Sequence, residues 1–200
     1  MMQVGTLSID PHAHPELAAL DGVPQPAEHH PEIDTLVHLR MVMNQIHKLT
    51  ADPRAHFAAL VHDLGKGLTP RELLPKHHDH EERGVPLVRP LGERLGVPAE
   101  WIALGELAAR FHTHVHRAEA MSPKGFRSLF RELGLVGPLD KHGRPAPLRP
   151  EELEAREDAF SILLLAAEAD ARGRLGLEDR PYPNPGVLRD ALARYRAGTL

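Results

Sequence analysis

The feature that most constrains this chain is a short apolar helix that ends in a histidine and an aspartate. Residues 57–61 read Phe-Ala-Ala-Leu-Val, His62 and Asp63 follow, and Gly65 supplies a helix stop. Adjacent helical residues point about 100° apart, so His62 and Asp63 can reach one metal ion only beyond the helix end. Other helices must then supply the remaining ligands. An imidazole with a carboxylate suits divalent ions such as Ni, Mn, Mg, Fe, Co or Zn.

The chain is rich in further candidate ligands. It has fifteen histidines against five Phe, two Tyr and one Trp, which favours a metal or proton-transfer site over a purely structural role for imidazole. The candidates on other predicted helices are His38, His80, His112, His114 and Asp170.

Composition excludes several classes of protein. The 200 residues suit one domain with a real core. A net charge of −4 argues against broad nucleic-acid binding, although a local basic groove stays open. The absence of cysteine excludes disulfides and Cys-type zinc sites. Without a signal sequence or an apolar run of about 18 residues, we expect a cytoplasmic protein that does not enter a membrane.

Apolar residues recur at helical spacing along most of the chain, and no segment reads convincingly as a strand. We therefore predict an all-α bundle of about eight helices. Pro86 and Pro90 are expected to kink or divide the helix at 80–95. Residues 1–15 are interpreted as a loose lead-in, 16–200 as the domain and 134–150 as a surface insertion. The expected helices cover one or two turns at 16–20, then 32–49, 53–62, 80–95, 98–112, 123–133, 150–172 and the closing tail.

Two candidates each have a structural alternative. His38 lies at the edge of the apolar face of helix 32–49. A lone histidine there is more often a structural residue bonded to a backbone carbonyl, but the candidate ligands downstream favour a metal ligand. Asp170 follows residues 159–167, which are apolar nearly all round and therefore central. A carboxylate there needs a partner, either a metal or an ion pair with Arg172 or Arg174.

The remaining histidines fall into two short clusters. In the first, Asp79 can cap the next helix and leave His80 in its first turn, so His80 is the favoured ligand. His77 and His78 are then expected nearer the substrate mouth or solvent. In the second, His112 continues an apolar stripe and ranks first. His114 ranks second and His116 third, in either a strand-like ligand comb or a frayed helix end.

At this point the residues resemble a known family. The order His38, His62-Asp63, Asp170 on helices is similar to the HD-domain metal-dependent phosphohydrolases, and most closely to the C-terminal HD domain of bacterial tRNA nucleotidyltransferases (CCA-adding enzymes). The similarity covers roughly residues 15–190. The motifs that carry it are GVPQ at 22–25, HPEIDT at 30–35, HDLGKGLTP at 62–70, His77-His78 with His80, Phe111-His112 and EADARGR at 168–174.

The resemblance implies a metal site and a class of reaction. It carries over His38, His62, Asp63 and Asp170 as the metal set, with His80 and His112 as the ligands of a second ion. In that family the domain is associated with 2′,3′-cyclic phosphodiesterase, 2′-nucleotidase and phosphatase activity. The nucleotidyltransferase domain that precedes it there is absent, so we do not expect this chain to add CCA. The Met1-Met2 start favours a free-standing protein over an excised domain.

The expected chemistry is hydrolysis of a nucleotide or RNA 3′-end phosphoester, with tRNA as an open candidate. Two histidines and two carboxylates leave metal positions for water and a phosphate oxygen. Asp63 is the expected shared ligand, or the general base if one ion binds. Lys66 either meets the phosphate or interacts with the helix dipole. Arg172 either clamps phosphate or pairs with a carboxylate, and His114 is placed with the substrate.

Three other functions remain open at this point. A 5′-nucleotidase or nucleotide pyrophosphohydrolase would use the same site. A non-catalytic module would bind tRNA or a protein through the same fold. A histidine-rich metal buffer would hold many weak sites. The ligand types accept one ion or two, and oligomeric state is not specified by these patterns.

Overall fold

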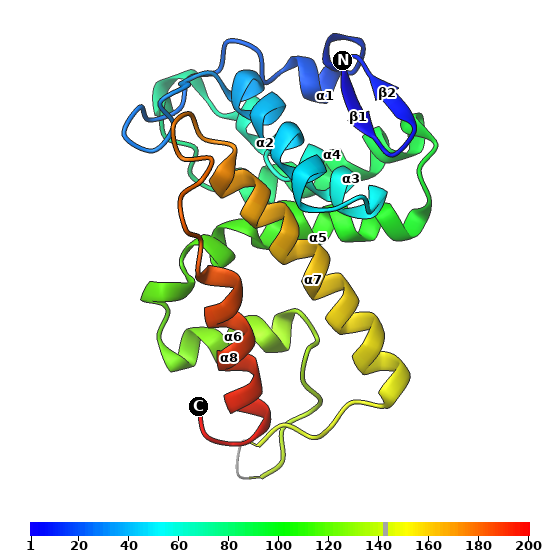
Figure 1. The fold of residues 1–200 in the computed structure, drawn as a ribbon, viewed down its shortest axis with the longest axis vertical. Helices are drawn as coiled ribbons and strands as arrows, with labels where there is room; N and C mark the ends of the chain where they lie inside the picture. The colour runs from blue at the N-terminus through cyan, green and yellow to red at the C-terminus, as the bar shows by residue number, and fades with distance from the viewer. Residues whose placement is uncertain (142–143) are drawn as a thin grey trace.

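A computed structural model describes residues 1–141 and 144–200 of the chain. These residues form eight α-helices and one two-stranded hairpin, which confirms the all-α prediction (Figure 1). The helices are α1 (Pro15–Ala18), α2 (Thr35–Leu49), α3 (Pro53–Val61), α4 (His80–Leu95), α5 (Ala99–His116), α6 (Pro123–Glu132), α7 (Pro150–Arg172) and α8 (Asn184–Arg196). The strands are β1 (Met2–Val4) and β2 (Leu7–Ile9), and the 3-10 turns are η1 (Pro11–Ala13), η2 (Leu64–Leu68), η3 (Arg71–Leu73) and η4 (Ala118–Ala120).

Helix α3 lies at the centre of the bundle, in contact with α2, α5 and α7. It begins where the side chain of Asp52 accepts a hydrogen bond from the Arg54 amide and Pro53 takes the first helical position. Every residue from 55 to 61 is buried. Since all sides of the helix are covered, the residues that follow its last turn are delivered into the protein interior.

Helix α7 joins two parts of the molecule. Figure 1 shows it running from the part that holds α6 and α8 to the bundle of α2, α3 and α5. Its buried residues include Leu163, Ala167 and Asp170, so Asp170 enters the same interior as the end of α3. In the described part of the chain, neither this 23-residue helix nor a shorter one is apolar enough to cross a bilayer.

Helix α4 runs as one element through both of its prolines, so the expected division does not occur. Pro86 and Pro90 are four residues apart and both are exposed. On that side of the helix, water can satisfy the carbonyl groups that lose an amide partner.

The N-terminal residues are ordered, which corrects the interpretation of 1–15 as a loose lead-in without strands. β1 pairs antiparallel with β2, and Gly5 at their turn has φ +55°, as short hairpin loops require. Met2, Val4 and Ile9 are buried in the core. Three residues per strand are too few for an alternating pattern to be visible in the sequence.

The predicted surface insertion at 134–150 starts inside the protein and then leaves it. Leu135 and Val136 are buried, whereas residues 138–141 are exposed. A hairpin-like pair of hydrogen bonds joins Gly137 to Ala146 and Ala146 to Pro138. Residues 142 and 143, within the predicted insertion, lie outside the described residues. The proposed domain limits remain a prediction.

Candidate metal centre

His62 and Asp63 converge because the chain leaves the helix between them. Asp63 has φ −113° and ψ 12°, outside the α-helical region, and it leads into η2. The His62 Nδ1–H donates to the Ala59 carbonyl at 2.7 Å, so Nε2 points away from α3. Its Nε2 lies 3.2 Å from Asp63 Oδ2, and both side chains are buried.

His38 on α2 and Asp170 on α7 meet at the same point. His38 Nε2 lies 3.0 Å from Asp170 Oδ1, and His62 Nε2 lies 3.8 Å from Asp170 Oδ2. One ligand atom each from His38, His62 and Asp63 fits within 4.8 Å of the others, a grouping able to hold a metal ion. The four residues predicted as the metal set are therefore neighbours, although three helices supply them.

His80 and His112 form a second group around the other oxygen of Asp63. Asp63 Oδ1 lies 3.2 Å from His80 Nε2 and 3.3 Å from His112 Nε2. These three residues also fit the spacing of metal ligands. Asp63 thus belongs to both groups, the position expected for a shared ligand.

Three of the histidines are oriented by the same device. His62, His80 and His112 each donate Nδ1–H to a backbone carbonyl three or four residues earlier, at 2.7, 2.8 and 3.0 Å. Each Nε2 is therefore the ring nitrogen that faces Asp63, and it can bind a metal ion when it carries no proton. The Nε2 atoms of His80 and His112 are only 3.2 Å apart, an arrangement that a cation between lone pairs would stabilise.

The donor atoms fit a divalent cation. In the described residues, His62 Nε2 and both carboxylate oxygens of Asp63 are buried without a well-oriented hydrogen bond. Burial opposes ionisation, but Lys66 and His62 hold the pKa of Asp63 well below its usual range. Burial also lowers the pKa of His112 to about 4, so its imidazole is neutral at pH 7. Anionic carboxylates and neutral imidazoles are the states that bind metal.

Lys66 is buried beside this centre. Its Nζ lies 2.6 Å from Asp63 Oδ2 and 2.6 Å from Gln25 Oε1. Lys66 and Gln25 line a cavity of about 560 Å³ next to His80. Lys66 is therefore buried against a carboxylate at the edge of the cavity and is not a solvated cation at a helix end.

His116 is a site residue that the sequence ranked too low. Its Nε2 lies 2.6 Å from Asp170 Oδ2, and its Nδ1 accepts a hydrogen bond from the Tyr182 hydroxyl at 2.8 Å. His114 is exposed and contacts the ring of Phe111 instead, so the expected order of these two histidines is reversed. The signal was available, because His112 and His116 are four residues apart and share one helical face.

Arg172 does not lie at the cavity. Its Nε and Nη2 both contact Glu168 Oε1 at 2.9 Å, which is the carboxylate pairing considered for it, and the phosphate role stays an untested prediction. Arg174 approaches Asp170 Oδ1, with its Nη2 at 3.8 Å. Asp170 therefore lies between histidines of the proposed metal group on one side and Arg174, one of the two arginines considered as its ion-pair partner, on the other.

Glu32 is a further residue of the centre to which sequence assigned no role. Its Oε1 lies 2.9 Å from His38 Nδ1, and its Oε2 accepts a hydrogen bond from the Leu175 amide at 3.1 Å. His38 Nδ1 also lies 3.2 Å from the Gly173 carbonyl, so Nδ1 faces two acceptors while Nε2 faces Asp170 Oδ1 at 3.0 Å. The next residue, Ile33, has φ +61°, a strained value for a β-branched side chain.

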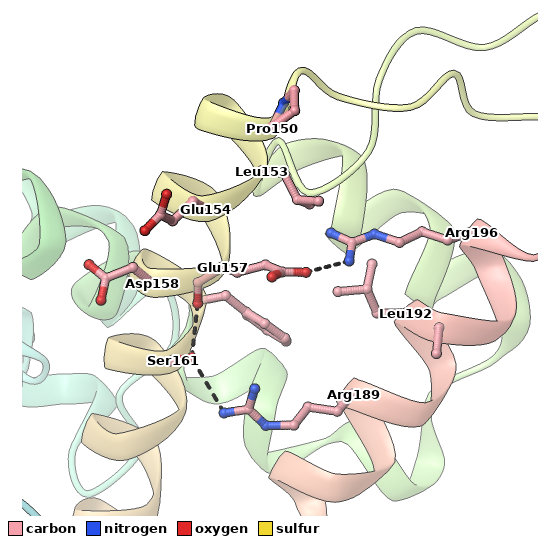
Figure 2. A pocket seen from close by; sticks show the side chains of 11 residues that line it. Pro150, Leu153, Glu154, Glu157, Asp158, Ser161, Arg189, Leu192 and Arg196 are labelled. Carbon is pink, nitrogen blue, oxygen red and sulfur yellow. Dashed lines mark hydrogen bonds and ion pairs between the residues drawn. The ribbon is translucent and has the colours of Figure 1, made fainter.

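A separate groove of about 700 Å³ lies between α7 and α8 (Figure 2). Three of its charged residues have partners: Arg196 pairs with Glu157 at 2.5 Å, and Arg189 contacts Ser161 at 3.5 Å. No histidine is among the described residues that line it. This groove is therefore distinct from the metal centre.

We predict that acid destabilises the metal-free protein through His77. Its Nε2–H donates to the Pro24 carbonyl at 3.1 Å, and its Nδ1 accepts from Thr69 Oγ1 at 2.8 Å. Burial and the charge of Lys66 lower its pKa from 6.5 to about 4. Between these values the unfolded chain binds more protons than the folded one, so stability falls as pH drops through this window.

The measurement is urea unfolding in EDTA at several pH values between 7 and 4. His77→Gln should show a shallower loss of stability over that range than the wild type. An unchanged slope in the variant would mean that other groups account for the acid sensitivity.

The model of the HD domain family matches residues 35–166. The chain is 46% identical over 183 residues to the Multifunctional CCA protein of Thioalkalivibrio sulfidiphilus, covering 92% of this chain and 40% of that protein. It is 46% identical over 177 residues to the Multifunctional CCA protein of Methylococcus capsulatus, covering 88% of this chain and 38% of that protein. It is 45% identical over 183 residues to the Multifunctional CCA protein of Burkholderia pseudomallei, covering 92% of this chain and 40% of that protein.

The chain thus spans about 40% of the length of these curated relatives. The family model, by contrast, covers well over half of the chain and includes the ends of α3 and α5 that form the centre. The match and the geometry agree on one conclusion: this chain belongs to the HD domain family.

Proposed function

We propose that this protein is a metal-dependent phosphohydrolase acting on nucleotide or RNA-terminal phosphoesters, with 2′,3′-cyclic and 2′-phosphates as the first candidates. The observation that supports this most is the pair of ligand groups that share Asp63. They lie beside a cavity that contains a buried lysine. A cation site and an ammonium group at one cavity suit a substrate with anionic oxygens.

In this proposal one divalent ion is held by His38, His62, Asp63 and Asp170, and a second by Asp63, His80 and His112. When bound, such ions supply a water of lowered pKa and neutralise charge on the phosphoryl oxygens. The protein residues hold their ligand atoms in place: His116 fixes one oxygen of Asp170, and Glu32 fixes the ring of His38.

Lys66 is proposed to bind the phosphate. An ammonium has three N–H donors, of which Gln25 Oε1 accepts one, while Asp63 Oδ2 forms an ion pair with Nζ at 2.6 Å. The cavity of about 560 Å³ is large enough for a nucleotide, since small-molecule sites run from about 300 to 1,000 Å³. An RNA or tRNA whose 3′ end bears a 2′,3′-cyclic or 2′-phosphate presents the same ester, and such substrates would place the protein in the cytoplasm.

The test is hydrolysis by protein stripped with EDTA and reloaded separately with Mn, Ni, Co, Zn or Mg. We expect 2′,3′-cyclic AMP and 2′-AMP to be hydrolysed faster than 5′-AMP, only in reloaded samples, with close to two ions per chain by elemental analysis. Preference for 5′-AMP or a nucleoside triphosphate would support the 5′-nucleotidase or pyrophosphohydrolase alternative.

A non-catalytic HD module is the second candidate to keep in view, because the curated relatives are named for CCA and not for hydrolysis. It predicts tight binding of tRNA or protein and no metal-dependent release of phosphate from any of these esters. That result would end the hydrolase proposal.

A further inference from the structure

Gln25 lines the cavity of about 560 Å³ beside the metal centre, and the NH₂ group of its side chain has no partner among the described residues. Its side chain is 2% exposed and lines the cavity beside Lys66. Its Oε1 lies 2.6 Å from Lys66 Nζ. Because an ammonium can only donate, the amide oxygen must be the atom that faces Lys66, which directs the NH₂ group elsewhere.

That NH₂ group has no partner in the described part of the chain, although it is buried. A buried donor without an acceptor costs about 1–3 kcal/mol, and native proteins rarely leave one unpaired. The unpaired donor therefore indicates that an acceptor joins this cavity from outside the chain.

The segment that carries Gln25 is held on three sides. The backbone N–H of Gln25 donates to the Ile33 carbonyl at 2.8 Å, and Thr35 Oγ1 donates to the Val23 carbonyl at 2.8 Å. His77 donates to the Pro24 carbonyl at 3.1 Å. Pro24 and Pro26 flank the glutamine and restrict its backbone to extended conformations. The backbone that carries the Gln25 side chain is thus fixed before any ligand arrives, and Lys66 holds the side-chain oxygen.

The neighbouring charges define what the ligand is. The nearest cation is Lys66, in direct contact with the amide. The carboxylates Glu28, Asp79 and Glu81 also line the cavity. Glu28 and Asp79 are exposed to solvent, and the half-buried Glu81 already accepts a hydrogen bond from Thr113 Oγ1 at 2.6 Å. Two buried donors side by side, one of them charged, are suited to an anionic oxygen.

We infer that Gln25 and Lys66 form an oxyanion subsite, in which Gln25 Nε2 donates to a non-bridging oxygen of the substrate phosphate. This inference rests on the proposed function, and it assigns Gln25 as a substrate-binding residue. It also explains the GVPQ segment at 22–25, to which the sequence assigned no chemistry.

The experiment uses two substitutions in the full chain loaded with Mn²⁺. Gln25→Glu keeps the acceptor for Lys66 but removes the donor and adds a negative charge. Gln25→Met removes the amide at similar size without adding charge. Gln45→Met is the matched control, because Gln45 is also buried but does not line this cavity. Circular dichroism and metal content are checked for each variant.

The readouts are the Kd for inorganic phosphate by calorimetry, and kcat and KM for 2′,3′-cyclic AMP. We expect both Gln25 variants to bind phosphate roughly 10-fold or more weakly, the loss of one hydrogen bond to a charged group. KM should rise more than kcat falls, metal content should stay at the wild-type level, and Gln45→Met should bind phosphate like the wild type.

Two results would overturn the inference: phosphate binding of wild-type strength in both Gln25 variants, or no phosphate binding by the wild type. Failure of the proposed function looks different. If the wild type binds phosphate and the Gln25 variants do not, the subsite stands even when none of the esters is hydrolysed.

Discussion

Asp63→Asn is expected to remove the bound metal and to lower phosphohydrolase turnover roughly a thousandfold or more. Asp63 lies within 3.3 Å of His62, His80 and His112 and is the residue common to both ligand groups. Replacing one carboxylate oxygen by an NH₂ group removes the shared anionic ligand from both groups at once, and leaves Asp170 as the anion of the first group. Elemental analysis and turnover of 2′,3′-cyclic AMP measure the two effects.

The same substitution leaves the buried ammonium of Lys66 without its carboxylate, so a loss of stability must be separated from a loss of metal. The double variant Asp63→Asn/Lys66→Met should regain part of the stability lost by Asp63→Asn but none of the metal. Asp190→Asn, an exposed position on α8, is the matched control. Near-stoichiometric metal in Asp63→Asn would falsify the assignment of Asp63 as the shared ligand.

Gly65→Ala is expected to destabilise the protein by at least about 3 kcal/mol, at the upper end for overpacking. A Cβ at Gly65 would lie 1.9 Å from the His80 carbonyl oxygen and 2.6 Å from the Gly84 amide nitrogen. Both are backbone atoms and cannot rotate away, so η2 and α4 must separate. Because His80 moves with α4, metal content should also fall towards one ion per chain.

Urea unfolding and elemental analysis test this expectation. Gly186→Ala is the control, since its Cβ would meet nothing within 4 Å among the described residues. Gly186 lies in α8, where alanine is the better helix former, so this variant should match or slightly exceed wild-type stability. Wild-type stability in Gly65→Ala would show that η2 and α4 are less tightly joined than these distances indicate.

The helices and the order of their ligands were within reach of the sequence. Apolar spacing located α2, α5 and α7, and Asp52-Pro53 marked the start of α3, because capping and periodicity are properties of a few consecutive residues. The structure brings together all six residues predicted to bind metal, which fits the family resemblance. Their role as ligands remains a prediction.

The side chains that contact these six residues could not be predicted from helical spacing, because most of the contacts depend on how the folded segments pack. The hairpin at 2–9 is held by burial against α2 and α3. A strand of three residues is too short for its sequence pattern to predict this packing. His116 belongs to the centre because its Nε2 contacts Asp170, which lies more than fifty residues away in the sequence. Glu32 belongs to it because its carboxylate contacts the ring of His38, six residues away. Arg172 is drawn to Glu168 on its own helix.

The sequence by itself therefore determined that this is an all-α chain with a His-Asp pair at the end of a buried helix. Only the tertiary structure decided which side chains orient that pair, and which donors, Lys66 and Gln25, share its cavity. The physical reason is range: helix formation depends on neighbours within a few residues, whereas a buried polar atom is satisfied by whichever group the fold places about 3 Å away.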